Sequence, residues 1–160
     1  MHEHLRRLDL VWIEPPVYFI TICTKNRRKA LTSEFAARVL IDEWERAREH
    51  HLWVIGRYVI MPDHVHFFCR PEHEAKTLSR FVGAWKTWTS RRIQNLKSQP
   101  AAAATTDGSV WQREFFDHLL RSNESYSEKW NYVRDNPVRG GLVACSDDWP
   151  YAGEIERLEF

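Results

Sequence analysis

The sequence predicts an α+β protein with a ferredoxin-like, split βαβ arrangement, in which helices cover one face of an antiparallel sheet. The main observation is the order of its segments, which runs strand, helix, strand, strand, helix, strand, helix. The strand segments are rich in β-branched and aromatic residues, whereas the helical segments carry apolar residues at helical spacing. A length of 160 residues suits one domain with a substantial core, so we expect residues 1–160 to form a single domain.

Four segments have strand character because β-branched and aromatic residues dominate them and turn-forming residues bound them. The second and third meet at Met61-Pro62-Asp63, a turn sequence, since proline cannot donate to a sheet ladder. The last of the four alternates less regularly than the first. These expected strands are residues 17–24, 52–60, 64–70 and 110–121.

Three segments have helical character, because apolar residues recur at the spacing of one helix face. Ser33 and Glu34 begin the first segment, while Ser125 and Glu128 form a possible capping box for the third. Pro137 is expected to end the third helix. In the second, the apolar stripe predicted to be core is Leu78, Phe81, Val82, Trp85 and Trp88. The expected helices are residues 34 to about 50, about 74–97, and 125–136.

The composition indicates a globular protein, because 43% of the residues are hydrophobic and eight are Trp. The N-terminal segment is too polar for a signal peptide, and no apolar run approaches the roughly 20 residues that span a bilayer, so we expect a cytoplasmic protein. Three widely spaced cysteines without a CxxC pair favour reduced thiols over a disulfide framework or a structural zinc site.

The charge is segregated although the formal net charge is only +1. Residues 76–98 contain several basic residues and no acid, residues 25–29 add four more positive charges, and the tail from about 147 to 160 is acidic. Basic clusters of this kind suit a polyphosphate partner, although a solvated helix face is the simpler alternative. An Ala-rich, low-complexity stretch at about residues 98–109 is expected to be a mobile loop.

Two short motifs could together build a metal-assisted nucleophilic site. In a strand His64 and His66 point to the same face, while Val65 points to the other. In a helix Tyr132 and Asn136, four residues apart, also share a face. Two imidazoles and an amide oxygen leave open coordination positions and suit Mg²⁺ or Mn²⁺ better than a closed thiolate site does.

Phosphodiester cleavage needs a nucleophile and a cation that neutralises charge on the phosphate, and these residues could supply both. A phenol with a pKa near 10 needs a nearby cation or base to lose its proton, and the sequence identifies no base. The alternatives are that the histidines only pack, that Tyr132 is a core residue, and that Asn136 is only a helix terminus before Pro137.

Three longer motifs resemble the REP-associated tyrosine transposases, a branch of the single-tyrosine HUH transposases (IS200-like). They are Met-Pro-Asp-His-Val-His-Phe-Phe at residues 61–68, Trp-Gln-x-x-Phe-Phe-Asp-His-x-x-Arg at 111–121, and Tyr-Val-x-x-Asn-Pro-Val-Arg-Gly-Gly-Leu-Val at 132–143. The resemblance runs in order from about Arg6 to Trp149.

The resemblance implies a metal-dependent endonuclease and strand transferase that acts on single-stranded DNA near palindromic hairpins. By this resemblance, His64 and His66 are metal ligands and Asn136 is the third. Tyr132 would be the nucleophile, forming a 5′-phosphotyrosine and releasing a 3′-hydroxyl that allows strands to be rejoined. Tyr126 would be a second nucleophile only by analogy with two-tyrosine relatives. The roles of Asp117 and His118 in the second motif stay unassigned.

Phosphate contacts to a DNA hairpin are expected from the basic residues at three places in the sequence. Two other functions remain open: a hairpin-binding protein whose site is silent, and a relaxase or replication initiator of the same class, which the short chain disfavours. The protein could be a monomer or a homodimer, and no membrane or other protein partner is inferred. The candidate DNA-binding residues are Arg6, Arg7, Lys25, Arg27, Arg28, Lys76, Arg80, Lys86 and Arg91.

Overall fold

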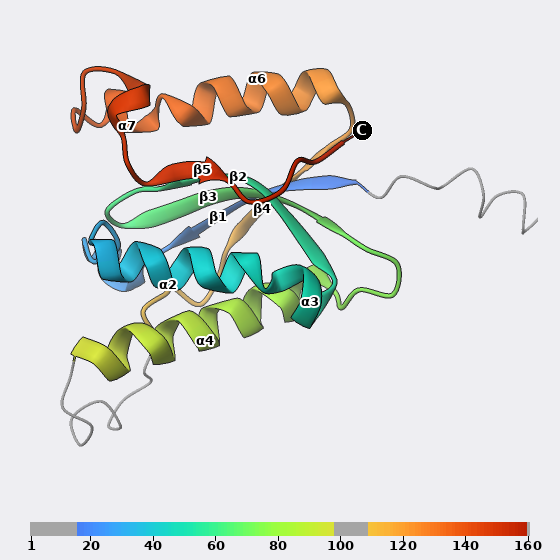
Figure 1. Cartoon of the computed structure of the whole chain (residues 1–160), viewed down its shortest axis with the longest axis horizontal. Helices are drawn as coiled ribbons and strands as arrows, with labels where there is room; N and C mark the ends of the chain where they lie inside the picture. The colour runs from blue at the N-terminus through green and yellow to red at the C-terminus, as the bar shows by residue number, and fades with distance from the viewer. Residues whose placement is uncertain (1–15, 98–108, 160) are drawn as a thin grey trace, which may run out of the picture.

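A computed structural model describes residues 16–97 and 109–159 and contains a five-stranded sheet in the order β4-β1-β3-β2-β5 (Figure 1). Every neighbouring pair of strands is antiparallel, which confirms the predicted α+β class and antiparallel sheet. The strand β5 was not predicted, because it comes from the acidic tail and contains only three residues. The strands are β1 (Val17–Cys23), β2 (Trp53–Ile60), β3 (His64–Pro71), β4 (Phe116–Leu120) and β5 (Ala152–Glu154).

The helices lie on both faces of the sheet rather than on one, which corrects one detail of the predicted arrangement. Figure 1 shows α2, α3 and α4 below the sheet and α6 and α7 above it. The α-helices are α2 (Glu34–Glu45), α3 (Ala47–His51), α4 (Leu78–Lys97), α6 (Asn123–Arg134) and α7 (Asn136–Arg139).

The inner strands explain this two-sided cover, because they are apolar on both faces. Ile20 of β1 and Phe67 of β3 lie in the core cluster that contains Trp44 of α2 and Trp85 of α4. Phe19, the neighbour of Ile20, points the other way and belongs to a second cluster. That cluster also contains Phe68 of β3 and two α6 residues, Tyr126 and Val133. Burial of this second apolar face requires α6 to pack opposite α2 and α4.

The ends of two predicted helices differ from the prediction. Ser33 caps α2 as predicted, but the first helical segment is interrupted at Arg46 before α3 begins. The helix α6 begins two residues earlier than predicted, since the Ser122 hydroxyl accepts from the Ser125 backbone N–H at 3.1 Å. It ends at Arg134, and Pro137 lies in the first turn of α7, where its missing N–H is tolerated. The prediction that Tyr132 and Asn136 share a face of one helix is therefore wrong, because Asn136 begins α7.

Two aromatic residues also differ from the prediction. Trp111 was expected in the fourth strand, but it forms only an isolated bridge to Thr24, and its buried indole N–H donates to Thr89 of α4 at 2.9 Å. Trp88 was expected in the core and is 49% exposed. It lies three residues beyond the buried Trp85, and the Arg91 guanidinium packs over its ring at 5.3 Å.

Some predictions fall outside the described residues. Arg6, Arg7 and nearly all of the Ala-rich stretch are among them. Within residues 16–97 and 109–159, no helix is long and apolar enough to cross a membrane. The cytoplasmic location and the single-domain organisation stay predictions.

Candidate active site

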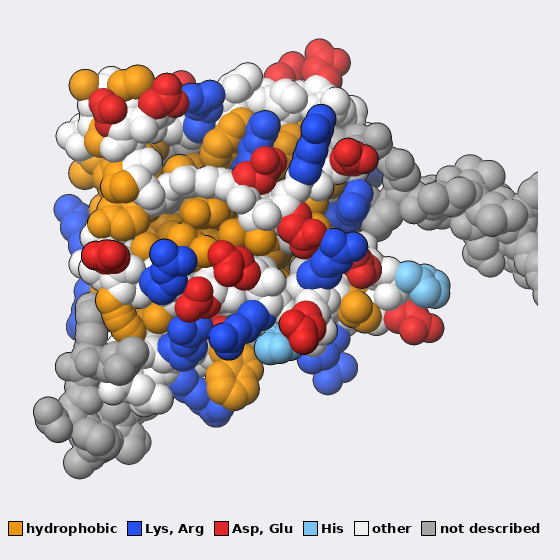
Figure 2. Space-filling model, viewed as in Figure 1, with side chains coloured by type: hydrophobic (Ala, Val, Ile, Leu, Met, Phe, Trp, Pro, Cys, Tyr) orange, Lys and Arg blue, Asp and Glu red, His pale blue; other side chains and the backbone are white. Residues whose placement is uncertain are grey.

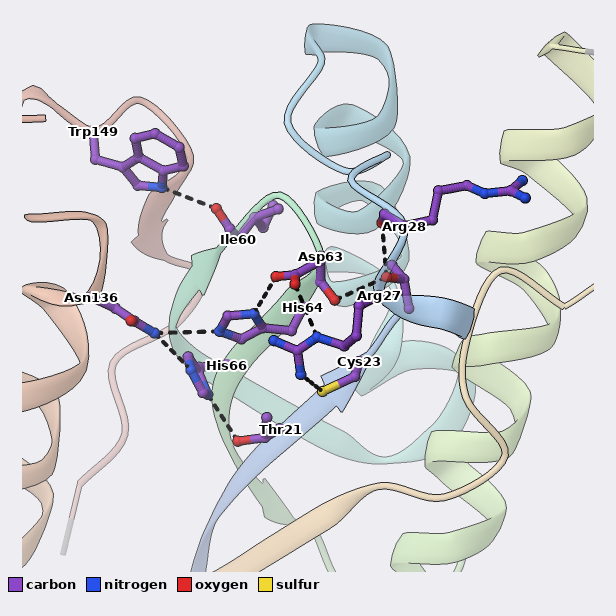
Figure 3. A network of polar contacts seen from close by, with 11 residues as sticks. Thr21, Cys23, Arg27, Arg28, Ile60, Asp63, His64, His66, Asn136 and Trp149 are labelled. Carbon is purple, nitrogen blue, oxygen red and sulfur yellow. Dashed lines mark hydrogen bonds and ion pairs between the residues drawn. The ribbon is translucent and has the colours of Figure 1, made fainter. Parts of the chain in front are cut away.

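The two histidines lie together on the sheet face that α6 covers (Figure 3). His64 and His66 are on β3, where they pair with Cys23 and Thr21 of β1. Their rings lie 4.7 Å apart between centroids. The Nε2 atoms of both rings approach one atom, the Asn136 Nδ2, at 3.4 Å for His64 and 2.9 Å for His66. The structure therefore brings together the three predicted metal ligands within one chain.

The other ring nitrogen of each histidine is held by a neighbouring side chain. Asp63 Oδ1 lies 2.8 Å from His64 Nδ1, and Asp63 Oδ2 accepts from Arg27 Nε at 2.9 Å. Because an ionised carboxylate only accepts, His64 Nδ1 carries a proton, which makes Nε2 the nitrogen that holds the lone pair in the neutral ring. His66 Nδ1 lies 2.8 Å from Thr21 Oγ1. These contacts fix both rings with Nε2 directed toward Asn136.

The charges around this cluster set the protonation of its members. Partial burial raises the pKa of Asp63, but hydrogen bonds from His64 and Arg27 outweigh it, and that pKa falls below its usual value. Burial, followed by the charges of His64, Lys129, Arg139 and Arg27, lowers the pKa of His66 to about 3. His66 is therefore neutral at physiological pH, the form in which an imidazole can bind a metal.

Asn136 is the side chain best placed to complete a metal site. Among the described residues, no group of three His, Cys, Asp or Glu side chains could hold a metal ion. A half-turn of the Asn136 amide would exchange Nδ2 for Oδ1 and direct a carbonyl oxygen toward the two Nε2 atoms. Two nitrogens and one oxygen would then surround a common point, so these residues fit a cation with open coordination positions.

Tyr132 lies on α6, and its environment excludes the alternative that it is a core residue. It is 62% exposed, whereas Tyr126 on the same helix is 4% exposed. The Arg139 guanidinium lies over the Tyr132 ring at 3.9 Å from the centroid and donates to the Tyr132 backbone carbonyl at 2.8 Å. The phenol is thus accessible and lies beside a fixed positive charge.

Sequence reasoning missed several residues that surround this cluster. Arg139 is part of the 132–143 motif and lies three residues after Asn136, a spacing that could have identified it. Lys129 lies one turn before Tyr132 on α6, so the same helical argument applies to it. Asp63 is adjacent to His64 in sequence, but the role of Thr21 depends on the pairing of β1 with β3 and has no local signal.

The predicted DNA-binding residues that the structure describes fall into two separate regions. Lys25, Arg27 and Arg28 are exposed in and beside the short helical turn η1 (Lys25–Arg27) that follows β1, and Arg27 reaches the histidine cluster through Asp63. The others lie on or just before α4, on the opposite side of the sheet from the histidines, where Figure 2 shows Lys and Arg side chains gathered at the lower edge. They are Lys76, Arg80, Lys86 and Arg91.

Comparison with known proteins identifies the family. The sequence model of the family described as Transposase IS200 like matches residues 16–136. The chain belongs to this family. The matched segment contains the histidine pair, Tyr132 and Asn136.

Individual relatives of this transposase-family chain agree with the assignment. It is 26% identical over 143 residues to the REP-associated tyrosine transposase of Escherichia coli strain K12, covering 88% of this chain and 78% of the relative. A Haemophilus influenzae protein assigned to the same group is 27% identical over 139 residues, covering 85% and 78%. The predicted resemblance to REP-associated tyrosine transposases is confirmed.

A solved structure shares the fold. It is a REP-associated tyrosine transposase bound to a REP hairpin, and it superposes with a TM-score of 0.68 at 21% identity, covering 88% of this chain and 77% of that chain. At this identity the similarity shows the fold alone. The antiparallel sheet and its helices therefore have the same fold as that structure.

Proposed function

We propose that this protein is an endonuclease and strand transferase that cleaves single-stranded DNA near palindromic-repeat hairpins through a 5′-phosphotyrosine. The observation that carries the proposal is the convergence of His64 Nε2 and His66 Nε2 on the Asn136 side chain, close in sequence to an exposed tyrosine. The E. coli relative is a REP-associated tyrosine transposase and the structural relative was bound to a REP hairpin, which supports the choice of substrate.

The residues that would hold a divalent cation, Mg²⁺ or Mn²⁺, are His64, His66 and Asn136. Such an ion, when bound, would neutralise charge on the scissile phosphate. Asp63 and Thr21 would keep the two imidazoles oriented and, for His64, in the required tautomer. Because the pKa of His66 is depressed, its ring stays unprotonated near neutral pH and its Nε2 lone pair is available to a cation.

Tyr132 would act as the nucleophile. Its phenolic oxygen would lose its proton and form a bond to the scissile phosphorus while the bond from phosphorus to the 3′ oxygen breaks. The 3′ oxygen takes up a proton as it leaves, so the step has no net change in protons. Arg139 lies over the Tyr132 ring, where its positive charge would face a phosphate bound beside the phenol. The phosphotyrosine keeps the phosphodiester energy, so a second 3′-hydroxyl can reverse the step and join strands.

The cations nearest the cluster are suited to hold the DNA backbone at the site. Arg27, Lys129 and Arg139 all act on His66 electrostatically, so a phosphate beside the histidines would meet three positive charges. The basic residues along α4 lie on the opposite face of the sheet from the histidines and would contact a more distant part of the DNA. Arg6, Arg7, Lys25 and Arg28 remain proposed phosphate contacts.

The test is a covalent-adduct assay with single-stranded hairpin DNA labelled at its 5′ or its 3′ end. Wild type, Tyr132→Phe and Tyr126→Phe are each incubated with Mn²⁺ or with EDTA and resolved on a denaturing gel. Tyr126→Phe is the matched control because it deletes the same oxygen from a buried tyrosine on the same helix. We expect a Mn²⁺-dependent adduct with the 3′-labelled fragment in wild type and Tyr126→Phe, and none in Tyr132→Phe.

Two results would contradict the proposal. An adduct that persists in Tyr132→Phe would assign the nucleophile elsewhere. Hairpin binding without any adduct would favour the alternative, a hairpin-binding protein with a silent site.

Sedimentation of the protein with and without the hairpin would distinguish a monomer from a homodimer.

A further inference from the structure

A hollow of about 450 Å³ lies between the edge strand β4 and helix α6, and Tyr132 forms part of its wall. Its volume is within the range of pockets that bind small organic groups. The same helix that carries the proposed nucleophile therefore also lines this open hollow. The lining residues are His118, Leu120, Ser125, Glu128, Lys129 and Tyr132.

The β4 side of the hollow offers a surface for a flat ring. Leu120 is buried and apolar, and the exposed imidazole of His118 lies two residues away on the same face of the strand. Unpaired bases are commonly held by stacking on aromatic rings and by packing on apolar side chains. A base could therefore lie against His118 and Leu120.

The α6 side of the hollow offers one positive and one negative group. The Lys129 ammonium lies 4.7 Å from the centroid of the Phe19 ring and acts electrostatically on His66, so it stands between the hollow and the histidine cluster. A phosphate joined to a base in the hollow would thus meet Lys129 on the side of the cluster. Glu128 presents an exposed carboxylate, which can only accept hydrogen bonds when ionised.

We propose that this hollow holds the unpaired nucleotide next to the cleaved phosphate and selects a base that carries an exocyclic amino group. The base lies against His118 and Leu120, its amino group donates to Glu128, and its phosphate lies toward Lys129 and Tyr132. Cytosine has such a donor, whereas thymine has a carbonyl at the equivalent position and would face the carboxylate unfavourably. This inference rests on the proposed function, because it specifies part of the substrate of the same site.

Cytosine and thymine provide the sharpest comparison, since the two pyrimidines are similar in size and stacking. We would measure binding of fluorescent, single-stranded oligo-dC and oligo-dT of equal length by anisotropy, using the full chain carrying Tyr132→Phe so that no cleavage occurs. We expect oligo-dC to bind about fivefold tighter or more. Glu128→Gln should abolish this preference, because an amide can also donate to the thymine carbonyl.

Matched variants separate the pocket from general charge effects. Glu124→Gln makes the same change one turn earlier on α6, outside the hollow, and should keep the preference for oligo-dC. Lys129→Ala should weaken both oligonucleotides equally and reduce the salt dependence of binding by roughly one unit of slope. Unfolding curves of each variant would confirm that the fold is retained.

A cleavage arm distinguishes failure of this inference from failure of the proposed function. Hairpins with C or T at each position beside the cut would be compared for adduct formation by wild type and Glu128→Gln. One outcome would reject base selection by the hollow and leave the proposed cleavage chemistry intact. In that outcome adducts form without a Glu128-dependent preference for C at either position, and the two oligonucleotides bind equally. A Glu128-dependent preference for oligo-dC without any adduct would support the pocket and reject the cleavage function.

Discussion

The contact between Asp63 and His64 allows the metal proposal to be tested in steps. Asp63 Oδ1 lies 2.8 Å from His64 Nδ1 and the carboxylate also pairs with Arg27. Groups that hold a ligating histidine in this way typically contribute 10–100-fold to metal affinity. In Asp63→Asn, the amide oxygen can still accept the His64 proton, whereas the charge and the acceptor for Arg27 Nε are lost. We expect a loss of about tenfold in Mn²⁺ affinity, or about 1.4 kcal/mol.

Asp63→Ala removes the hydrogen bond as well as the charge, so its loss should approach roughly a hundredfold, or about 2.7 kcal/mol. The assay is calorimetric titration of the metal-free protein with MnCl₂. Asp147→Asn is the matched control, because Asp147 also pairs with an arginine, Arg134, at 2.9 Å but is exposed and contacts neither histidine. Equal Mn²⁺ affinity in wild type and both Asp63 variants would refute the reasoning that this carboxylate supports a metal-binding histidine.

Three further predictions concern the second histidine and the stability of the fold. Thr21→Val removes the hydroxyl beside His66 Nδ1 with little change of shape, and Mn²⁺ affinity in the same titration should fall roughly tenfold. The low pKa of His66, about 3, means that the unfolded chain gains a proton below about pH 6.5 while the folded chain does not, so stability decreases as the pH falls from 6.5 toward 3. By pH 5 this loss should reach about 2 kcal/mol in EDTA, and urea unfolding of His66→Gln should lack this part of the pH dependence. Gly83→Ala should raise the free energy of unfolding by about 0.5–1 kcal/mol, because a Cβ there meets no atom within 4 Å and glycine is unfavourable inside the α4 helix. An unchanged or lower midpoint of urea unfolding would contradict this prediction.

Local sequence patterns were sufficient for the inner strands and for most helices, because burial imposes a clear periodicity on them. Ile20 and Phe67 show this, since each lies within a segment so rich in β-branched and aromatic residues that a buried strand was the expected structure. The arrangement of layers was harder to predict. Phe19 and Phe68 face away from Ile20 and Phe67, so the strands required cover on both faces, and this signal was present in the sequence but was not used. The short strand β5 has no strong pattern, because its pairing with β2 determines it.

For the site, the strand period identified the histidine pair, which lies on one strand. The helical spacing of Tyr132 and Asn136 was misleading, because Tyr132 lies on α6 and Asn136 begins α7. His64 and His66 converge as strand geometry requires, and their approach to Asn136 follows once α6 packs on that face. The supporting residues were less accessible to prediction. Thr21 reaches His66 only through the register of β1 against β3, which depends on tertiary pairing and not on any local pattern.

The central claim is that Tyr132 forms the covalent bond to DNA, and peptide mapping of the adduct tests it most directly. Wild-type protein would be trapped with hairpin DNA in Mn²⁺, treated with nuclease and trypsin, and analysed by mass spectrometry. Cleavage after Lys129 and Arg134 isolates Tyr132 in the peptide of residues 130–134, whereas Tyr126 falls in the peptide of residues 122–129. We predict a nucleotide adduct on Tyr132 in the 130–134 peptide. An adduct on any other residue, or an unmodified 130–134 peptide in protein that has cleaved its DNA, would contradict the account.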